Sequence, residues 1–461
     1  MASQMSRRTL LGSATALAAG AVAARPSGAY AAAPRAATPS GARVHAAGAS
    51  DFLESIGICA HVGQGVDDPS RSADAIAYAG IRNVRDSDNV SASYVADLVA
   101  MHNQTGARFV LVRSGPDDAW LTGQLDASRG LATAGALLAL EGPNEPNNWA
   151  VTYNGKSSVW DQDFTPVAGW QRALYQQAKA DPVLRTYPVF HTSEAGGSEP
   201  NNVGLQFLRI PDGAGTLMPD GTVYADYANV HNYICRKPAI IDNMAWLNAS
   251  PDFVDWIDGV YGEYGVTWRK KFAGYTSAAA RAALPKVTTE NGWPTGDPAG
   301  GKLTEEQQAR LYLNLYLAQF ARGFRHTFLY MLRDGGGGDA GFGLFDIDYN
   351  PKQSANYLHN LTTILADDGV LATMPQALHY SIADQPETVH DLLLHKGSGA
   401  SFLTVWNERA NGSDDVVVDL GDSYDIKVYD PTVGTAPIQT GANVRTISLT
   451  LSDHPVLIET S

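Results

Sequence analysis

Two glutamates, each at the end of an apolar run, are the first residues in this chain that could do chemistry. Glu145 lies in Leu-Glu-Gly-Pro-Asn-Glu-Pro-Asn-Asn-Trp (140–149), directly after the apolar residues 131–140. Glu290 closes the similar run 283–290. An apolar run that stops at Gly-Pro-Asn predicts a buried strand ending in a surface loop. Two such carboxylates can act together, one as a proton donor and the other as an ionised nucleophile.

The elements that must position these glutamates alternate along the chain. Short apolar runs are separated by segments with helical periodicity, which predicts parallel strands with crossover helices. The runs lie at 55–62, 80–88, 106–114, 136–146, 186–193, 227–234, 283–295 and 324–334. Eight such units predict an α/β fold, a (β/α)₈ TIM barrel, over residues 51–365. The alternative, a doubly wound open sheet, is disfavoured because residues 61–70 lack the G-x-G-x-x-G fingerprint.

Barrel geometry brings the carboxyl ends of all the strands to one mouth, where such folds place their active sites. The candidate site residues at or after these ends are His61, Arg85, Glu141, Asn144, Glu145, Trp149, His231, Tyr233, Glu290 and Trp293. Glu145 and Glu290 are far apart in the chain but would face the same pocket. A pair of carboxylates flanking one pocket is what the hydrolysis of a glycosidic bond requires.

The residues around the two glutamates resemble the motifs of clan A glycoside hydrolases. The sequence Asn144-Glu145-Pro146 follows the fourth strand, and Thr-Glu-Asn-Gly-Trp (289–293) follows the seventh. Arg85 after the second strand and His-x-Tyr (231–233) after the sixth extend the resemblance. The stretch 342–352 is similar to family 39-like members, which also carry a β-sandwich after the barrel. One departure is Tyr-Met (330–331), where clan members often carry a tryptophan, and it predicts an unusual substrate floor.

The resemblance implies a retaining mechanism that uses neither a metal nor an organic cofactor. Glu290 is the expected nucleophile, and Glu145 is the expected acid and base. Asn144 is expected to bind the 2-hydroxyl of the sugar. Arg85 and Tyr233 are expected to hold the carboxylate of Glu290 ionised and correctly aimed.

The remaining candidates have supporting parts in this hypothesis. His231 is expected either to tune Glu145 or to contact the sugar. Glu141 is expected to be a structural carboxylate that binds loop amides or Arg85. His61 and Trp149 are candidate sugar contacts, and Trp293 is the foremost candidate for an aromatic surface on which a sugar ring stacks.

The sequence leaves two other functions open beside hydrolysis of oligo- or polysaccharides. A transglycosylase would use the same two carboxylates with a different acceptor. A non-catalytic, carbohydrate-binding barrel is the other alternative, and the presence of both glutamates favours catalysis over it. The sugar, the linkage and the position of cleavage along a chain depend on loop shapes that residue spacing does not determine.

The N-terminal residues 1–50 predict an export signal followed by a linker. Ser-Arg-Arg-Thr-Leu-Leu (6–11) resembles a twin-arginine signal, and an ordinary secretory signal is the alternative. The mature protein is therefore expected to be secreted or periplasmic. No later run has the ~18 apolar residues of a membrane helix, so no membrane partner is expected after signal removal. The net charge of −15 means that the chain has no excess of positive charge to attract nucleic acid, so no nucleic-acid partner is expected.

The chain changes character at its C-terminal end. Residues 366–461 are short β-like runs separated by turn signals, which predicts an antiparallel β-sandwich. This domain could bind polysaccharide or brace the barrel, and its few aromatics, chiefly Trp406 and Tyr429, favour bracing. The only cysteines, Cys59 and Cys235, could form a disulfide in an exported protein or remain buried thiols.

Overall fold

The structure is a computed structural model of the chain. It describes residue 44 and residues 46–87, 89–158, 163–195, 203–234, 240–252, 272–367 and 378–461. Most of the expected signal and linker, and Cys235, lie outside the described residues. Within the described part, no helix combines the length and the apolar character needed to cross a membrane.

Eight parallel strands form the barrel, as the sequence predicted. They are β2 (Ile56–Cys59), β3 (Asn83–Ser87), β4 (Arg108–Val112), β5 (Leu137–Glu141), β8 (Val189–Phe190), β9 (Ala228–Asn229), β10 (Lys286–Asn291) and β11 (Phe324–Leu329). Their order in the sheet is β8-β5-β4-β3-β2-β11-β10-β9. A parallel bridge between Phe190 and Tyr227 joins the two edge strands, so the sheet is nearly closed.

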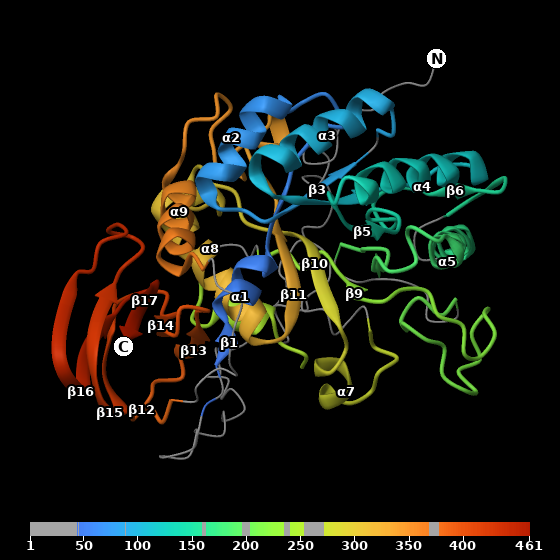
Figure 1. The fold of residues 1–461 in the computed structure, drawn as a ribbon. Helices are drawn as coiled ribbons and strands as arrows, with labels where there is room; N and C mark the ends of the chain where they lie inside the picture. Colours follow the sequence, from blue (N-terminus) through green and yellow to red (C-terminus); the bar gives the residue numbers. More distant parts are fainter. Residues whose placement is uncertain are drawn as a thin grey trace.

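Helices surround this sheet (Figure 1), and local signals fix the ends of some of them. They are α1 (Ala49–Ser55), α2 (Pro69–Ala79), α3 (Ala92–Thr105), α4 (Asp118–Thr133), α5 (Thr165–Ala180), α6 (Met244–Asn248), α7 (Ala278–Ala282), α8 (Glu305–Ala321) and α9 (Gln353–Leu365). The side chain of Asp68 caps α2 at its start, and Gly80 ends it in the left-handed conformation. Thr304 and Gln307 form a capping box at the start of α8.

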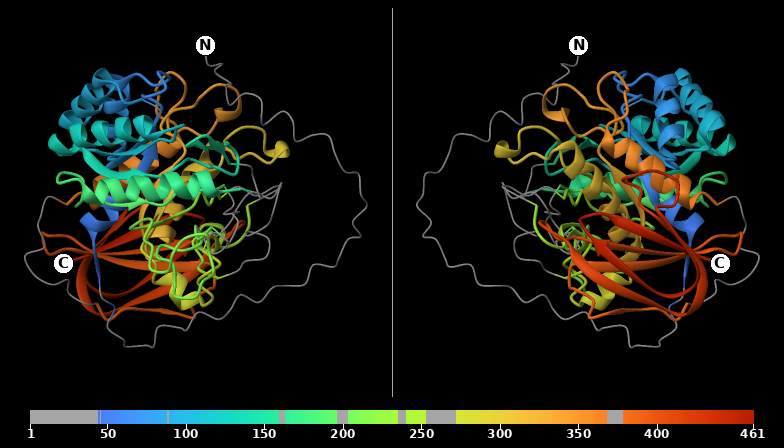
Figure 2. Two further views of the ribbon diagram at one scale, coloured as in Figure 1. Left: turned by 90° about the vertical axis from the view of Figure 1, so that its right-hand side faces the viewer. Right: turned by 90° about the vertical axis from the view of Figure 1, so that its left-hand side faces the viewer.

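The C-terminal strands form the expected β-sandwich, which packs against the barrel beside α8 and α9 (Figures 1 and 2). They are β12 (Ser381–Ala383), β13 (Val389–His395), β14 (Ser401–Asn407), β15 (Asp414–Tyr429), β16 (Gln439–Leu451) and β17 (Pro455–Thr460). The N-terminal strand β1 (Ala47–Gly48) pairs with β13 in parallel. The end of the expected linker is therefore part of this sheet, a pairing that no local pattern in the sequence indicates.

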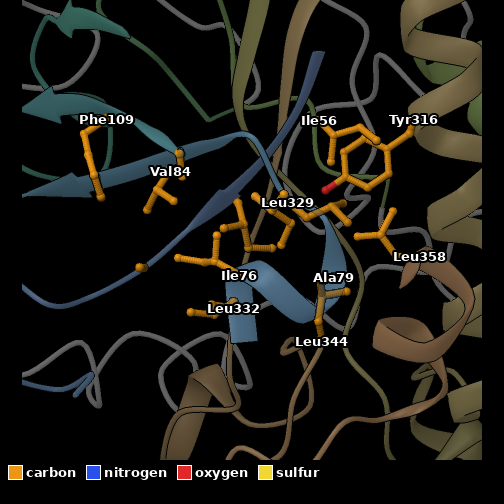
Figure 3. Packing of buried hydrophobic residues seen from close by; sticks show 14 of the residues in the cluster. Ile56, Ile76, Ala79, Val84, Phe109, Tyr316, Leu329, Leu332, Leu344 and Leu358 are labelled. Atoms are coloured by element: carbon orange, nitrogen blue, oxygen red, sulfur yellow. The ribbon is translucent and has the colours of Figure 1, made fainter. Parts of the chain in front are cut away.

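One continuous apolar core lies between the barrel strands and the helices around them. In Figure 3, Ile56 of β2, Val84 of β3 and Leu329 of β11 gather with residues of α2, α8 and α9. Each is fully buried, and burying such a side chain contributes about 1.5–3 kcal/mol. The hydroxyl of Tyr316 on α8 donates to the carbonyl oxygen of Gly57 at 2.7 Å, which ties this helix to β2.

Aromatic residues join the sandwich to the barrel. His390 of β13 stacks on Trp246 of α6 with ring centres 4.1 Å apart. Trp406 is fully buried against both rings, and its indole donates to Glu408 at 2.9 Å. A buried Trp406 has no free face for a sugar ring, which is consistent with the bracing role expected for this domain.

A buried histidine at the end of the barrel opposite the predicted active site makes the stability of the fold sensitive to acid. The Nδ1 atom of His326 on β11 lies 2.9 Å from the carbonyl oxygen of Glu54. Burial, with the nearby positive charge of Arg325, lowers the pKa of His326 to about 3. An unfolded histidine has a pKa of about 6.5. Between these two values the unfolded chain binds a proton that the folded chain does not, so acid favours unfolding.

We expect His326→Gln to weaken this acid sensitivity. In the wild type, this one group should reduce the free energy of unfolding by about 1.4 kcal/mol per pH unit as the pH falls below about 6.5. Urea unfolding of both proteins between pH 7.5 and 4.5 measures the difference. The matched control is His359→Gln, because His359 also contacts a backbone carbonyl but is only half-buried. Parallel stability curves for wild type and His326→Gln would contradict the prediction.

Candidate active site

The predicted site residues converge at the carboxyl ends of the strands. Arg85 lies within β3, Glu141 ends β5, and Glu290 lies near the end of β10. Asn144 and Glu145 follow β5 in a loop held by Glu145 N–H, which donates to the carbonyl of Ser193 at 2.7 Å. The barrel therefore brings together side chains from strands that are distant in sequence.

Arg85 is the centre of the cluster. Its Nε and Nη2 atoms donate to the two oxygens of Glu141 at 2.7 and 2.9 Å. Its Nη1 donates to Oε1 of Glu290 at 2.7 Å, and its Nη2 also donates to Oδ1 of Asn144 at 2.7 Å. Burial alone would lower the pKa of Arg85, but the two carboxylates outweigh it and hold the pKa well above its usual value. The bidentate contact makes Glu141 a structural carboxylate that aims the guanidinium at Glu290.

Both oxygens of Glu290 accept hydrogen bonds from side chains of the cluster. Arg85 binds Oε1, and the hydroxyl of Tyr233 donates to Oε2 at 2.6 Å. Burial, followed by the negative charges of Glu290 and Glu145, raises the pKa of Tyr233 well above its usual value, so the phenol keeps its proton and remains a donor. A guanidinium and a phenol together stabilise negative charge on Glu290 and fix its orientation.

Glu145 has a different set of neighbours. Its Oε1 lies 2.8 Å from Nδ1 of His231, and its Oε2 accepts from the amide of Asn148 at 3.0 Å. The side chain is 13% exposed, against 5% for Glu290. The backbone of Glu145 has φ of 41°, in the left-handed region that ordinary residues rarely occupy. The protein thus holds this carboxyl group, in a strained conformation, at the open side of the cluster.

Thr289, which the sequence analysis did not single out, connects the two halves of the cluster. Its hydroxyl donates to Oε1 of Glu141 at 2.9 Å, and Nδ2 of Asn229 donates to its oxygen at 2.9 Å. The Nε2 atom of His231 lies 3.1 Å from the same oxygen. Because a carboxylate is the stronger acceptor for the hydroxyl proton, we assign the proton on His231 to Nε2. The Nδ1 atom of His231 then faces Glu145 as an acceptor.

The two catalytic candidates are close together. The atoms of Glu145, Glu290 and His231 that could bind a metal ion all lie within 4.8 Å of one another. Among the residues that the structure describes, these three are therefore the group that could hold a cation. Arg85 already neutralises Glu290, however, and His231 already contacts Glu145. The arrangement fits an acid and a nucleophile better than a set of metal ligands.

Trp293 does not occupy the position expected for it. Its side chain is only 2% exposed and belongs to the core between barrel and helices. The indole donates to the carbonyl of Gly301 at 2.9 Å, and Gln308 of α8 donates to the carbonyl of Trp293 at 2.8 Å. The prediction of a sugar-stacking surface at Trp293 is therefore wrong, because the loop after β10 turns this ring under α8.

His61 and Trp149 lie beside the cluster, as the barrel geometry implied. His61 lines a polar hollow that also contains Arg85 and Asn144. Its backbone N–H donates to Asp67 at 2.8 Å, and Asp67 pairs with Arg333 at 2.8 Å, so this loop has a fixed shape. Trp149 is 36% exposed, and its backbone N–H donates to the carbonyl of Glu145 at 2.9 Å. The indole of Trp149 is thus available for a ligand near Glu145.

Cys59 lies beneath Arg85 as a free, buried thiol. Its Sγ donates to the carbonyl of Thr289 at 3.2 Å. Burial raises the pKa of this thiol far above its usual value, so it is unreactive. The structure therefore favours the buried-thiol alternative for Cys59.

Sequence comparisons do not identify relatives of this chain. No model of a known protein family matches it, and no curated protein sequence matches it either.

Solved structures do resemble it. A family 39 glycoside hydrolase from Bacteroides cellulosilyticus WH2 is 16% identical, with 89% of this chain and 82% of that chain covered, at a TM-score of 0.55. A glucosidase from Croceicoccus marinus is 11% identical, with coverage of 92% and 98% and a TM-score of 0.52. A family 30 xylanase from Clostridium acetobutylicum is 13% identical, with coverage of 91% and 97% and a TM-score of 0.50.

These similarities extend over both the barrel and the sandwich, and the family 39 and family 30 enzymes belong to clan A. The chain therefore has the fold of the clan A glycoside hydrolases, a (β/α)₈ barrel followed by a β-sandwich.

Proposed function

We propose that this chain is an exported, retaining glycoside hydrolase that cleaves oligo- or polysaccharides by double displacement. The observation that carries the proposal is the pairing of Glu145 and Glu290, of which one carboxylate oxygen each lies within 4.8 Å of the other. A retaining enzyme has its carboxyl groups about 5–5.5 Å apart, whereas an inverting enzyme needs about 6.5–9.5 Å to admit a water molecule. The short separation supports retention.

In the first step, Glu290 attacks the anomeric carbon while the bond to the leaving oxygen breaks. Glu145 gives its proton to that oxygen, so that the product leaves as an alcohol and the sugar is bound covalently to Glu290. Before this transfer, the protonated Glu145 donates a hydrogen bond to the unprotonated Nδ1 of His231. Arg85 and Tyr233 hold Glu290 in line during the attack.

In the second step, Glu145 acts as a base. It removes a proton from an incoming water molecule, whose oxygen attacks the anomeric carbon and releases Glu290. Two inversions at the same carbon restore the original configuration. The amide of Asn144 binds the 2-hydroxyl of the sugar, and its contact with Arg85 supports this role.

Export belongs to the same proposal. It is supported by Arg7-Arg8 and the small residues after them, which resemble a twin-arginine signal.

The experiment that tests the proposal follows both the substrate and the stereochemistry. We expect the wild type to release sugar from at least one member of a panel of plant and microbial glycans and aryl glycosides. Proton NMR of the first product formed should show the anomer of the substrate, because retention follows from the short carboxylate separation.

Three other outcomes have clear meanings. Inversion would exclude the double displacement. Transfer of the sugar to another sugar, with little release into water, would identify a transglycosylase with the same catalytic pair. Binding of glycans without any turnover would identify a carbohydrate-binding barrel instead.

A further inference from the structure

A polar hollow extends the catalytic cluster toward the loop after β4. Its lining joins Arg85 and Asn144, which belong to the cluster, to Arg113 and Ser114, which follow β4. His61 and Ser87 also line it. Hydroxyl, amide, imidazole and guanidinium groups around one hollow suit a ligand rich in hydroxyl groups.

The arginine in this lining is stacked on an aromatic residue. The Cζ atom of Arg113 lies over the ring of Trp120 at 4.2 Å from its centre. Trp120 is in the first turn of α4, and it is 42% exposed even though Arg113 covers part of it. An exposed tryptophan beside a polar hollow is the combination that binds sugars, since the C–H face of a sugar ring packs on the indole while side chains bind its hydroxyls.

Gly115 and Gly123 leave the space into which Trp120 and Arg113 pack. A Cβ atom on Gly115 would come within 2.5 Å of the ring of Trp120, and one on Gly123 would come within 2.8 Å of Nη1 of Arg113. The chain therefore leaves out a side chain at both points where Arg113 and Trp120 pack. The loop after β5 supports the same region, because the N–H of Asn154 donates to the carbonyl of Pro116 at 2.9 Å.

The position of the hollow indicates which part of a substrate it receives. The leaving group must reach Glu145, whose carboxyl group faces His231 after β9. The hollow instead borders Asn144 and Arg85, and neither Glu145 nor Glu290 lines it. It therefore lies on the side of the sugar that becomes bound to Glu290, away from the leaving group.

We propose that Arg113 and Trp120 form a second sugar-binding subsite, which takes the sugar unit attached to the one under attack. This inference rests on the proposed function and makes it more specific. The enzyme transfers at least two linked sugar units to Glu290, so its substrates are glycan chains and not single terminal sugars.

The test compares substrates that share a leaving group and differ by one sugar. The probes are 4-nitrophenyl xyloside with xylobioside and 4-nitrophenyl glucoside with cellobioside, together with the corresponding pair for any other sugar that the panel identifies. We expect kcat/KM of the wild type to be about 10-fold or more higher for the disaccharide member. In Trp120→Ala this ratio should fall about 10-fold, and Trp120→Phe should restore most of it, because a phenyl ring still offers a stacking face.

Ile347→Ala is the matched control. Ile347 is 56% exposed in the loop after β11, at the same end of the barrel, and should leave both rates and their ratio unchanged. A wild type that gains nothing from the second sugar, or a ratio that Trp120→Ala does not change, would overturn this inference and leave the proposed function standing. A wild type that cleaves neither member of any pair, nor any glycan of the panel, would overturn both.

Discussion

Glu290→Gln should reduce kcat/KM by at least about 10³-fold on every substrate that the wild type cleaves. Glutamine has nearly the same shape, and its carbonyl oxygen can still accept from Arg85 or Tyr233. It lacks the negative charge that attacks the anomeric carbon, so no covalent intermediate can form. Hydrolysis rates of the aryl glycoside identified by the panel measure the effect, and the variant should remain folded because Arg85 keeps its pair with Glu141.

The control for this substitution is a more exposed glutamate that also pairs with arginine, at the other end of the barrel. Glu54 pairs with Arg82 and Arg108, far from the carboxyl ends of the strands. Glu54→Gln should leave kcat/KM within about 2-fold of the wild type, since surface ion pairs contribute at most about 1 kcal/mol to stability and none to the reaction. Activity that survives in Glu290→Gln would mean that the nucleophile is another residue.

Covalent labelling gives an independent measurement. A 2-fluoro sugar with a good leaving group reacts in the first step but is released slowly in the second. Mass spectrometry of the wild type should find this sugar on the peptide that contains Glu290. A label on Glu145 would reverse the roles of the two carboxylates, and unlabelled protein with active wild type would argue against a covalent intermediate.

The barrel could be predicted from sequence because its strands are continuous apolar runs at a regular spacing. The residues at the ends of those runs could be predicted for the same reason, since barrel geometry brings every strand end to one place. Arg85, Tyr233 and His231 accordingly contact the two glutamates as expected. The pairing of β1 with β13 could not be predicted, because it joins segments that are distant in sequence and no local pattern marks it.

Trp293 and Thr289 show the limits of strand-end reasoning. A position in sequence does not say which way a loop turns, and the loop after β10 buries Trp293 under α8. Thr289 precedes Glu290, and neighbouring residues on a regular strand point to opposite faces. The register of β10 against β11 shifts between Thr288 and Asn291. The side chains of Thr289 and Glu290 therefore both contact the catalytic cluster. No local pattern in the sequence marks such an irregularity.

Glu145→Ala should separate the two parts that this residue plays. Loss of the proton donor should reduce kcat/KM by about 10²–10⁴-fold for natural glycans, whose leaving oxygen needs a proton. Aryl glycosides with acidic leaving groups need little help in the first step, so their loss should be much smaller. The second step still lacks its base, and the covalent intermediate on Glu290 should accumulate. A burst of released phenol followed by slow turnover would show that the covalent intermediate accumulates.

Azide should then rescue Glu145→Ala, because it is an anion that attacks without giving up a proton. Removing the side chain also opens space beside His231, where Glu145 is partly exposed in the wild type. The product should be a glycosyl azide with the anomeric configuration of the substrate, since azide would approach the face that water uses. Glu290→Ala offers the contrasting case: azide there would replace the nucleophile and give the inverted azide. If the two variants gave the opposite products, Glu145 would be the nucleophile and Glu290 the acid, although Arg85 and Tyr233 bind the latter.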